Sequence, residues 1–439
     1  MSYEQAVKGD GVHRITALEA DDSCSNKLAG VIHKRYLKRA PAREDWGSFF
    51  MADHTNALII GSLVFLGSLI SVETGISVAL IEILMGVIGG NVLNLSPTPW
   101  LTFLAGFGGI LLTFLAGAEV DMVILREKAK ESLLIGGISF LAPFLGTIAY
   151  GYWIAHWTLK ASILGGIALS TTSLAVIYAV LVETGLTHYE IGKILMASCF
   201  ITDLGTALAL SLIFAEFNAF TLVFVGVSAL VIFATPKISP FLFKRYGDRV
   251  IEPEIKFLFF ILFLFIFVSK LGSSHAILPA FVAGLALSKT FNENRLLQRK
   301  LRVIAFAMIT PFFFINGGIN VSLKMLYQNV GLFVMLFAVK QITKVAGIYP
   351  FARRYVRKEA MFITLLMSTG LTMGTIASMF GLSTGLIDQT QFSVLVAAVV
   401  ASAILPTFVA QKWFYPSHIM NEDNDRQQSP VEKIGGKDV

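Results

Sequence analysis

The residue of this sequence that is best suited to chemistry is Asp203. It lies near the middle of a long apolar segment, IGKILMASCFITDLGTALALSLIF, close to Thr202 and Thr206. A carboxylate at the centre of a membrane-spanning helix costs about 2.5–3.5 kcal/mol on insertion scales, so such residues usually serve a function. A carboxylate there can hold either a proton or a small cation, but not both. This competition is the simplest chemistry for exchanging one for the other; a structural ion pair is the alternative.

Three further ionisable residues lie inside apolar segments. Lys340 and Lys344 are four residues apart, on one face of a predicted helix. Each needs a carboxylate partner or must give up its proton, and Asp203 is the partner that we expect for one of them. Snorkelling of Lys340 to the membrane surface is the alternative. Glu82, in ALIEILMGVIGG, is either a second carboxylate on an ion pathway or a structural partner for a base.

The composition places these residues in a membrane. Of 439 residues, 55% are hydrophobic and 15% are charged, against about 25% charged in soluble domains. This predicts an all-α polytopic membrane protein with about 13 transmembrane helices and excludes an ordinary soluble enzyme. The apolar runs are 55–72, 74–95, 99–120, 131–155, 161–184, 191–214, 219–240, 255–270, 274–290, 303–321, 326–350, 359–381 and 390–414.

The chain divides into a polar and basic N-terminal tail (1–54), a transmembrane domain (55–414) and a short polar C-terminal tail (415–439). The N-terminal tail is either solvated or a membrane-surface anchor. Loops that follow even-numbered spans carry only Lys160, Lys270 and Lys324, whereas the other loops are basic, so we expect a cytoplasmic C-terminus. An odd number of spans would then put the basic tail outside, which conflicts with its charge.

Two pairs of matching segments indicate internal symmetry. Spans 3 and 10 both end in a polar, glycine-containing exit, GAEVD and NGGIN. Spans 5 and 12 are interrupted by Ser170-Thr171-Thr172-Ser173 and by Ser368-Thr369-Gly370-Leu371-Thr372-Met373-Gly374. The offset of seven spans gives the two halves opposite orientations. Paired broken helices in inverted repeats are typical of a secondary transporter's binding site; tight helix contacts through small residues are the alternative.

The segments resemble, in order, those of the monovalent cation:proton antiporter superfamily, in particular its second family. That family includes bacterial sodium/proton antiporters and the membrane part of potassium efflux systems. The resemblance covers about residues 55–414. The matching segments are LIEILMGVIGG, FLAGAEVD, ALSTTSLAV, ITDLGTAL, PFFFINGGINV, ITKVAG and STGLTMGTIASMFGL.

The resemblance implies exchange of Na+ or K+ for H+ by elevator-type alternating access. Asp203 would bind the cation and the proton, with Thr202, Thr172 and Ser173 nearby. Lys344 would lie opposite the aspartate, with Glu82 as a further charge partner. Ser368, Thr369 and Thr372 would form the second crossover of two crossed, discontinuous helices. The implied protein has a core domain and a dimerisation domain and is a homodimer in the cell (inner) membrane, in contact with lipids.

One departure from the family pattern bears on stoichiometry. Electrogenic members have two adjacent aspartates, and here the first position is Thr202. A single carboxylate predicts electroneutral exchange of one proton for one cation. Electroneutral sodium exchangers, however, often carry Arg where this chain has Lys344, and a proton released by that lysine would change the stoichiometry.

Other functions are weaker readings of the sequence. A sodium-coupled organic anion symporter would need a basic pocket, and deep arginines are scarce. A channel or a non-transporting membrane sensor would not need a titratable site between matched helix breaks. The sequence has no P-loop and no helical His pair spaced for a metal. We therefore expect no enzymatic activity, cofactor, structural metal or nucleic-acid partner.

Overall fold

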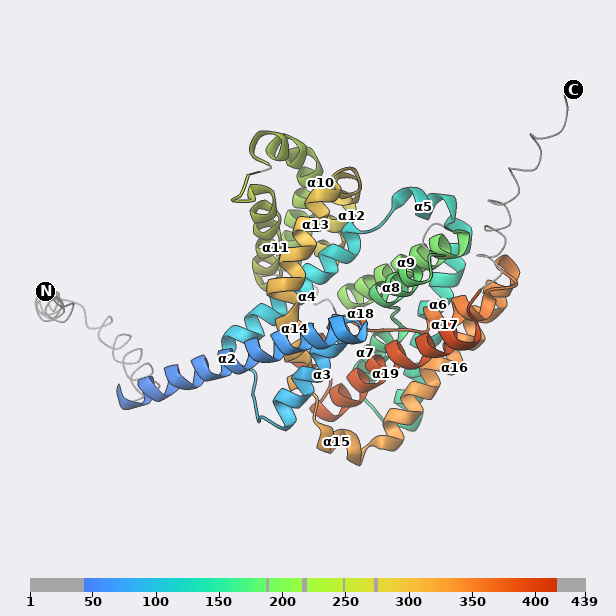
Figure 1. The fold of residues 1–439 in the computed structure, drawn as a ribbon, viewed down its shortest axis with the longest axis horizontal. Helices are drawn as coiled ribbons and strands as arrows, with labels where there is room; N and C mark the ends of the chain where they lie inside the picture. Colours follow the sequence, from blue (N-terminus) through green and yellow to red (C-terminus); the bar gives the residue numbers. More distant parts are fainter. Residues whose placement is uncertain (1–42, 187–188, 215–218, 248, 272–274, 417–439) are drawn as a thin grey trace, which may run out of the picture. The chain divides into compact units, whose positions relative to one another are not determined.

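The computed structural model describes residues 43–186, 189–214, 219–247, 249–271 and 275–416 (Figure 1). The chain divides into two units, 1–58 and 59–439. In the first unit, the described residues form the start of helix α2, which begins at Arg43, inside the predicted polar tail. The rest of that tail, most of the C-terminal tail and Cys24 lie outside the described residues.

The described chain is built from helices and the turns between them. In chain order, the helices are α2 (Arg43–Thr74), α3 (Val78–Asn91), α4 (Pro99–Ala118), α5 (Met122–Glu127), α6 (Ala129–Ala149), η1 (Tyr150–Ile154), α7 (Leu159–Ser170), α8 (Leu174–Glu183), α9 (Glu190–Ile213), α10 (Ala219–Tyr246), α11 (Pro253–Leu271), α12 (Ile277–Glu293), α13 (Arg295–Ile304), η3 (Ala305–Ile309), α14 (Thr310–Ile319), α15 (Leu323–Gln328), α16 (Val330–Tyr355), α17 (Ala360–Met367), α18 (Thr372–Ser383) and α19 (Gln389–Trp413).

Ten helices of the described chain are long and apolar enough to cross a membrane, if each broken or bulged helix is counted once. The apolar helix α3 is shorter, with 14 residues. The thirteen apolar runs fall on single helices or on successive helices separated by a short break or turn, so the all-helical membrane fold is confirmed. The number of spans stays a prediction.

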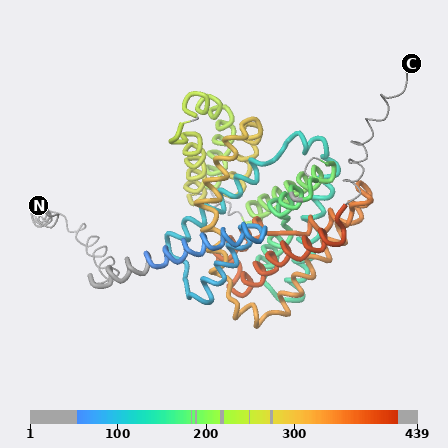
Figure 2. Tube along the Cα trace, viewed as in Figure 1, coloured from blue at the N-terminus to red at the C-terminus, as the bar shows by residue number. Residues whose placement is uncertain are grey.

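The order of the elements shows the predicted repeat. An apolar helix (α4 or α14) leads into a six-residue helix (α5 or α15), a long helix (α6 or α16), a broken helix and a final long helix (α9 or α19). Asp121 caps the start of α5 and Ser322 caps the start of α15 through their side chains. In Figure 2 the later helices of the first repeat, in green, lie beside those of the second, in orange and red.

Reciprocal glycine contacts hold two helix pairs together. A Cβ on Gly117 of α4 would overlap the carbonyl oxygen of Phe281 on α12, and one on Gly284 would overlap that of Phe114. The pair of α3 and α14 repeats this arrangement with Gly86 and Gly318, which face the carbonyls of Ile315 and Ile83. The backbones can lie this close only because neither helix has a side chain there. We call α3, α4, α10, α11, α12, α13 and α14 the glycine-paired group.

The remaining long helices form a second group around the two broken helices. Helix α6 packs against α7, α9 and α16, while α19 packs against α16, α17 and α18. The breaks themselves are Thr171–Ser173, between α7 and α8, and Ser368–Leu371, between α17 and α18. Both breaks meet inside this group, where the backbone of Ser173 donates to Thr369 Oγ1 at 3.5 Å. We call α6, α7, α8, α9, α16, α17, α18 and α19 the crossover group.

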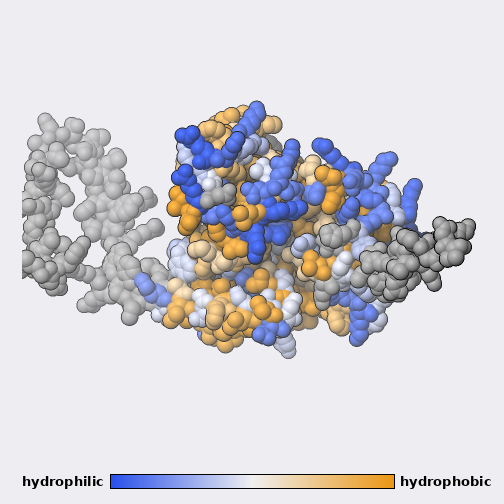
Figure 3. Space-filling model, turned by 45° about the horizontal axis from the view of Figure 1, so that its top comes forward, coloured by the Kyte–Doolittle hydropathy of each residue, from blue (hydrophilic) through white to orange (hydrophobic). Residues whose placement is uncertain are grey.

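Large apolar side chains cover much of the outer surface. Phe103, Leu222, Phe233 and Phe267 are all more than half exposed. On the face shown in Figure 3, hydrophilic side chains gather in the upper part and hydrophobic ones dominate lower down. An apolar exterior of this kind fits a lipid environment, and it indicates an integral multi-pass membrane protein.

Candidate functional site

Asp203 lies on α9, in the middle of the crossover group. It is 3% exposed, and its Oδ1 atom has no hydrogen-bond partner within the residues that the structure describes. A buried carboxylate oxygen without a donor is costly, since its lost hydration is not replaced. The oxygen is available to take a proton or to coordinate a cation.

A cavity of about 730 Å³ reaches Asp203 between the two helix groups. One wall comes from α4, α12 and α13 of the glycine-paired group and from η3, which continues α13. The other wall comes from α8, α9 and α18 of the crossover group. The charged side chains that line it are Glu119, Asp121, Lys193, Asp203, Arg295 and Arg302. The cavity therefore offers a polar path to the buried carboxylate.

The two broken helices present their inner N-termini to the same cavity. Thr172 and Leu174, at the start of α8, line it together with Thr372 and Met373 at the start of α18. Helix N-termini carry partial positive charge and unpaired N–H groups. They favour negative charge nearby, which suits the carboxylate of Asp203.

Lys344 is fully buried and binds oxygens of both breaks. Its Nζ lies 3.0 Å from the Thr171 carbonyl, 2.9 Å from Thr172 Oγ1 and 2.7 Å from the Met367 carbonyl. Ser139 Oγ, at 3.1 Å, is a fourth acceptor for an ammonium with three N–H donors. Lys344 thus neutralises the C-terminal, partly negative ends of α7 and α17.

The described residues contain no ion pair between Asp203 and either buried lysine. The direct partner expected for Lys344 is therefore replaced by backbone carbonyls and hydroxyls. Lys340 is also fully buried, so it does not snorkel, and its Nζ donates to Ser402 Oγ at 2.8 Å.

The remaining predicted site residues bond mainly within their own helices, apart from Thr369, which also accepts from the Ser173 backbone of the other break. Thr202 donates to the Cys199 carbonyl at 2.7 Å, Ser368 to that of Thr364 at 2.7 Å and Thr369 to that of Leu366 at 2.7 Å. Ser173 caps α8 by accepting from the backbone of Val176. Of the predicted site residues, the structure brings Thr172 and Thr372 to the cavity together with Asp203.

Glu82 lies elsewhere, on α3. It is 1% exposed, and its Oε2 atom has no hydrogen-bond partner in the described part of the chain. It is absent from the residues that line the cavity of Asp203. The structure gives no support to a direct contact between Glu82 and the crossovers.

An ion pair that the sequence reasoning missed lies in the cavity wall. Arg302 Nε donates to Glu119 Oε1 at 2.7 Å. Glu119 belongs to the segment FLAGAEVD, and the polar, glycine-containing end of that span is the sequence feature that could have drawn attention to it. Arg302 lies 183 residues away, and no local pattern joins the two.

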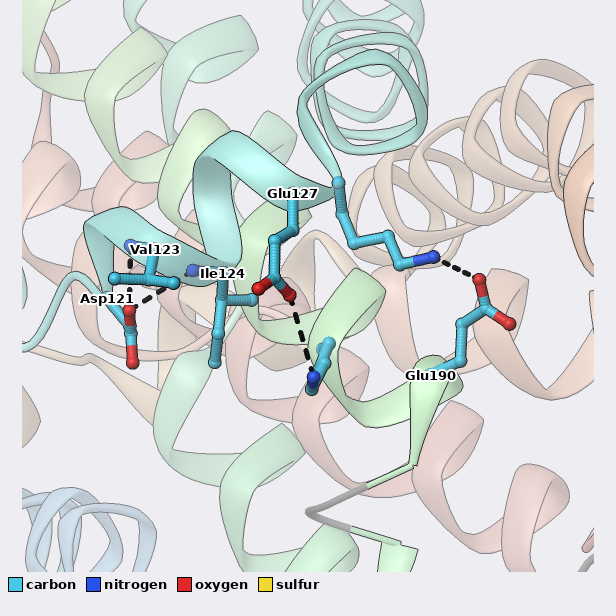
Figure 4. A network of polar contacts seen from close by, with 7 residues as sticks. Asp121, Val123, Ile124, Glu127 and Glu190 are labelled. Carbon is cyan, nitrogen blue, oxygen red and sulfur yellow. Dashed lines mark hydrogen bonds and ion pairs between the residues drawn. The ribbon is translucent and has the colours of Figure 1, made fainter.

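Charged contacts also tie α5 to the first turn of α9 (Figure 4). Lys128 pairs with Glu190, and Glu127 pairs with Lys193 at 3.6 Å. The hydrogen bond to the Glu190 carboxylate raises the pKa of the Lys128 ammonium. Asp121, the cap of α5, accepts from the backbones of Val123 and Ile124, so its carboxylate is already in use.

Comparison with known proteins gives consistent matches. Residues 60–412 match the family described as sodium/hydrogen exchanger, transmembrane. The probable Na+/H+ antiporter 3 of Methanocaldococcus jannaschii is 27% identical over 354 residues, which cover 77% of this chain and 89% of that protein. The Na+/H+-K+ antiporter GerN of Bacillus cereus is 27% identical over 362 residues, or 80% and 92% of the two chains.

A solved structure shares the fold. The sodium proton antiporter MjNhaP1 of Methanocaldococcus jannaschii superimposes with a TM-score of 0.62 and 15% identity, over 82% of this chain and 98% of the other. The match to the family covers most of the chain. The protein therefore belongs to the sodium/hydrogen exchanger family, within the monovalent cation:proton antiporter superfamily.

Proposed function

We propose that this protein is a secondary active transporter that exchanges Na+ or K+ for H+ at Asp203. The observation that carries the proposal is the unpartnered Oδ1 atom of Asp203, buried beside a cavity where both broken helices begin. Relatives named as Na+/H+ and Na+/H+-K+ antiporters support it. The names of these relatives do not choose between the two cations for this chain.

The proposed cycle uses the carboxylate as a site for one occupant at a time. A cation would bind Asp203 with oxygens of the crossover region, of which Thr172, in the lining of the same cavity, is a candidate. A proton would replace it on the carboxylate. Each occupant neutralises the charge, so the loaded site crosses the low-dielectric region at lower cost than the bare carboxylate. Elevator-type movement of the crossover group against the glycine-paired group would then expose Asp203 to the other side.

The exchange is proposed to be electroneutral. Lys344 has carbonyl and hydroxyl acceptors in place and does not need Asp203 as its counter-ion. It can keep its charge throughout the cycle, which leaves one proton exchanged for one cation. Lys193 and Arg295 lie at the cavity and in segments that we predict to face the cytoplasm, so the structure would represent an inward-facing state.

The remaining assignments follow from the family resemblance. We propose a homodimer in the cell membrane, in contact with lipids, with the C-terminus in the cytoplasm. The crossover group would correspond to the core domain and the glycine-paired group to the dimerisation domain.

The test is exchange by purified protein in liposomes that contain a pH-sensitive dye. Na+ or K+ added against an imposed proton gradient should restore the dye signal in the wild type and not in Asp203→Asn. Asp121→Asn is the matched control, since this aspartate lines the same cavity but serves as a helix cap, and asparagine also caps. It should retain exchange.

Clamping the membrane potential tests the stoichiometry. One-for-one exchange predicts a rate that does not depend on the potential.

Exchange that survives in a folded Asp203→Asn protein would contradict the site assignment. Cation flux without proton counterflow would instead favour a channel, and sodium uptake that requires an organic anion would favour a symporter.

A further inference from the structure

Lys340 is a buried base that the exchange described above does not use. It is 0% exposed and lies on α16, one turn before Lys344. Its Nζ donates a hydrogen bond to Ser402 Oγ, at 2.8 Å. Lys344 has four acceptors, whereas Lys340 has a neutral hydroxyl. The two lysines therefore differ sharply in how well their positive charge is compensated.

The helices packed against α16 bring no acid close to Lys340. Helices α6, α15, α17 and α19 pack against it, and α17 carries no titratable residue. Gly146 of α6 lies against Thr343, so the start of α6 at Ala129 lies about 26 Å away along that helix. The charged residues of the packed helices lie at or near their ends: Lys130 and Glu131 on α6, Lys324 on α15 and Lys412 on α19. Arg353 and Arg354 end α16 itself, and Tyr327 on α15 is exposed. The charged group nearest to Lys340 in sequence on α16 is Lys344.

Two ammonium groups one helical turn apart repel each other, and an uncompensated one is unfavourable when buried. A lysine in such a place can take up or lose a proton as the pH changes. The two forms differ in what they require: the ammonium needs several acceptors, whereas the amine is satisfied by the hydroxyl.

The acceptor that an ammonium would seek belongs to the second crossover. Lys340 Nζ lies 2.5 Å from where a Cβ of Gly370 would be, so a side chain at this position would displace the lysine. Ser402 Oγ already lies 3.4 Å from the Gly370 carbonyl. Protonation of Lys340 would place a stronger donor beside this carbonyl and hold the break more firmly against α16.

We propose that Lys340 is a proton-binding positioning residue, which acts on the second crossover at Gly370 and makes exchange depend on pH through a group other than Asp203. The inference rests on the proposed exchange function. Lys340 does not touch the transported cation. Its proton binds to the amine nitrogen, R–NH2 + H+ giving R–NH3+, and affects the movement of the crossover rather than the occupancy of Asp203.

The first test is the pH dependence of exchange in the same liposomes. Lys340→Met should retain exchange, and the pH of its half-maximal rate should differ from that of the wild type by at least about one unit. Lys412→Met is the control, an exposed lysine on α19 whose removal should leave the profile unchanged. Ser402→Ala removes the hydroxyl partner and should also move the profile. Wild-type profiles in both Lys340→Met and Ser402→Ala would overturn the inference, and so would an equal shift in Lys412→Met.

A second measurement does not depend on transport. The melting temperature of the purified protein in detergent is followed against pH for the wild type and Lys340→Met. If Lys340 exchanges a proton, the difference between the two melting temperatures must vary with pH. A constant difference would overturn the inference even if the wild type exchanges cations. A varying difference without exchange in the wild type would contradict the proposed function and leave the titration of Lys340 supported.

Discussion

The buried charges of this protein fall into two kinds. Lys344 is surrounded by oxygens that the helix breaks release, whereas one oxygen of Asp203 has no donor among the described residues. A satisfied buried charge stabilises one arrangement of its neighbours, and an unsatisfied one stores energy that a ligand can release. This difference supports our proposal that Asp203 binds the transported ions, with Lys344 holding the two crossovers together.

Replacing Lys344 with methionine should therefore destabilise the protein. The change leaves the Thr171 carbonyl without its lysine donor, while the Met367 carbonyl keeps the hydroxyl of Thr172, and a buried unsatisfied group costs about 1–3 kcal/mol. We expect a lower melting temperature in detergent, at any cation concentration. Lys324→Met, on the exposed helix α15, is the control and should melt as the wild type does. An unchanged melting temperature in Lys344→Met would show that the crossovers do not need this lysine.

At the scale of single residues, the sequence predicts whether a charged side chain is buried better than it predicts which groups that side chain contacts. Asp203 is conspicuous because a carboxylate interrupts an apolar run, and the structure finds it buried there. The partners of Lys344 are largely backbone carbonyls, which every residue possesses. They become acceptors only where a helix stops, and which side chain reaches them depends on the packing of helices distant in sequence.

At the scale of elements, the repeat is visible in how helices meet as well as in their order. Each close pair joins one helix of each half, α4 with α12 and α3 with α14, and in both pairs a glycine faces the carbonyl of the residue three positions before the partner's glycine. The serine, threonine and glycine clusters predicted the breaks in spans 5 and 12 correctly, since few apolar side chains remain to continue packing there. The glycine pairs were not predicted, because single glycines are common in membrane helices and only the tertiary structure shows which ones touch.

Gly318→Ala should weaken the contact between α3 and α14. The added methyl group would overlap the Ile83 carbonyl and the Gly86 backbone, neither of which can turn aside as a side chain can. Overpacking of this kind costs about 1–3 kcal/mol, which should appear as a lower melting temperature. Gly106→Ala, at a helical site with open space around it, is the control and should be neutral or slightly stabilising. Equal stability of the two variants would contradict the close-packing argument.

At the scale of the whole membrane unit, the two helix groups are joined tightly within themselves, and the cavity of Asp203 lies between them. The walls of this cavity carry residues that can be replaced by cysteine to test whether the two groups move against each other. Ala116 on α4 belongs to the glycine-paired group, whereas Ala175 on α8 and Met196 on α9 belong to the crossover group. If the groups move against each other, a bridge between them must stop the cycle, while a bridge within one group need not.

Cysteine pairs separate these cases in a chain whose Cys24 and Cys199 have been replaced by serine. Joining Ala116→Cys to Ala175→Cys with a cleavable bifunctional thiol reagent should abolish exchange in liposomes, and cleavage should restore it. Joining Ala175→Cys to Met196→Cys fills the same cavity with the same reagent but links two helices of one group, so most of the exchange should remain. Loss of exchange in both pairs would mean that the reagent only blocks the cavity. Full exchange in the bridged Ala116–Ala175 pair would show that cations cross without relative movement of the two groups.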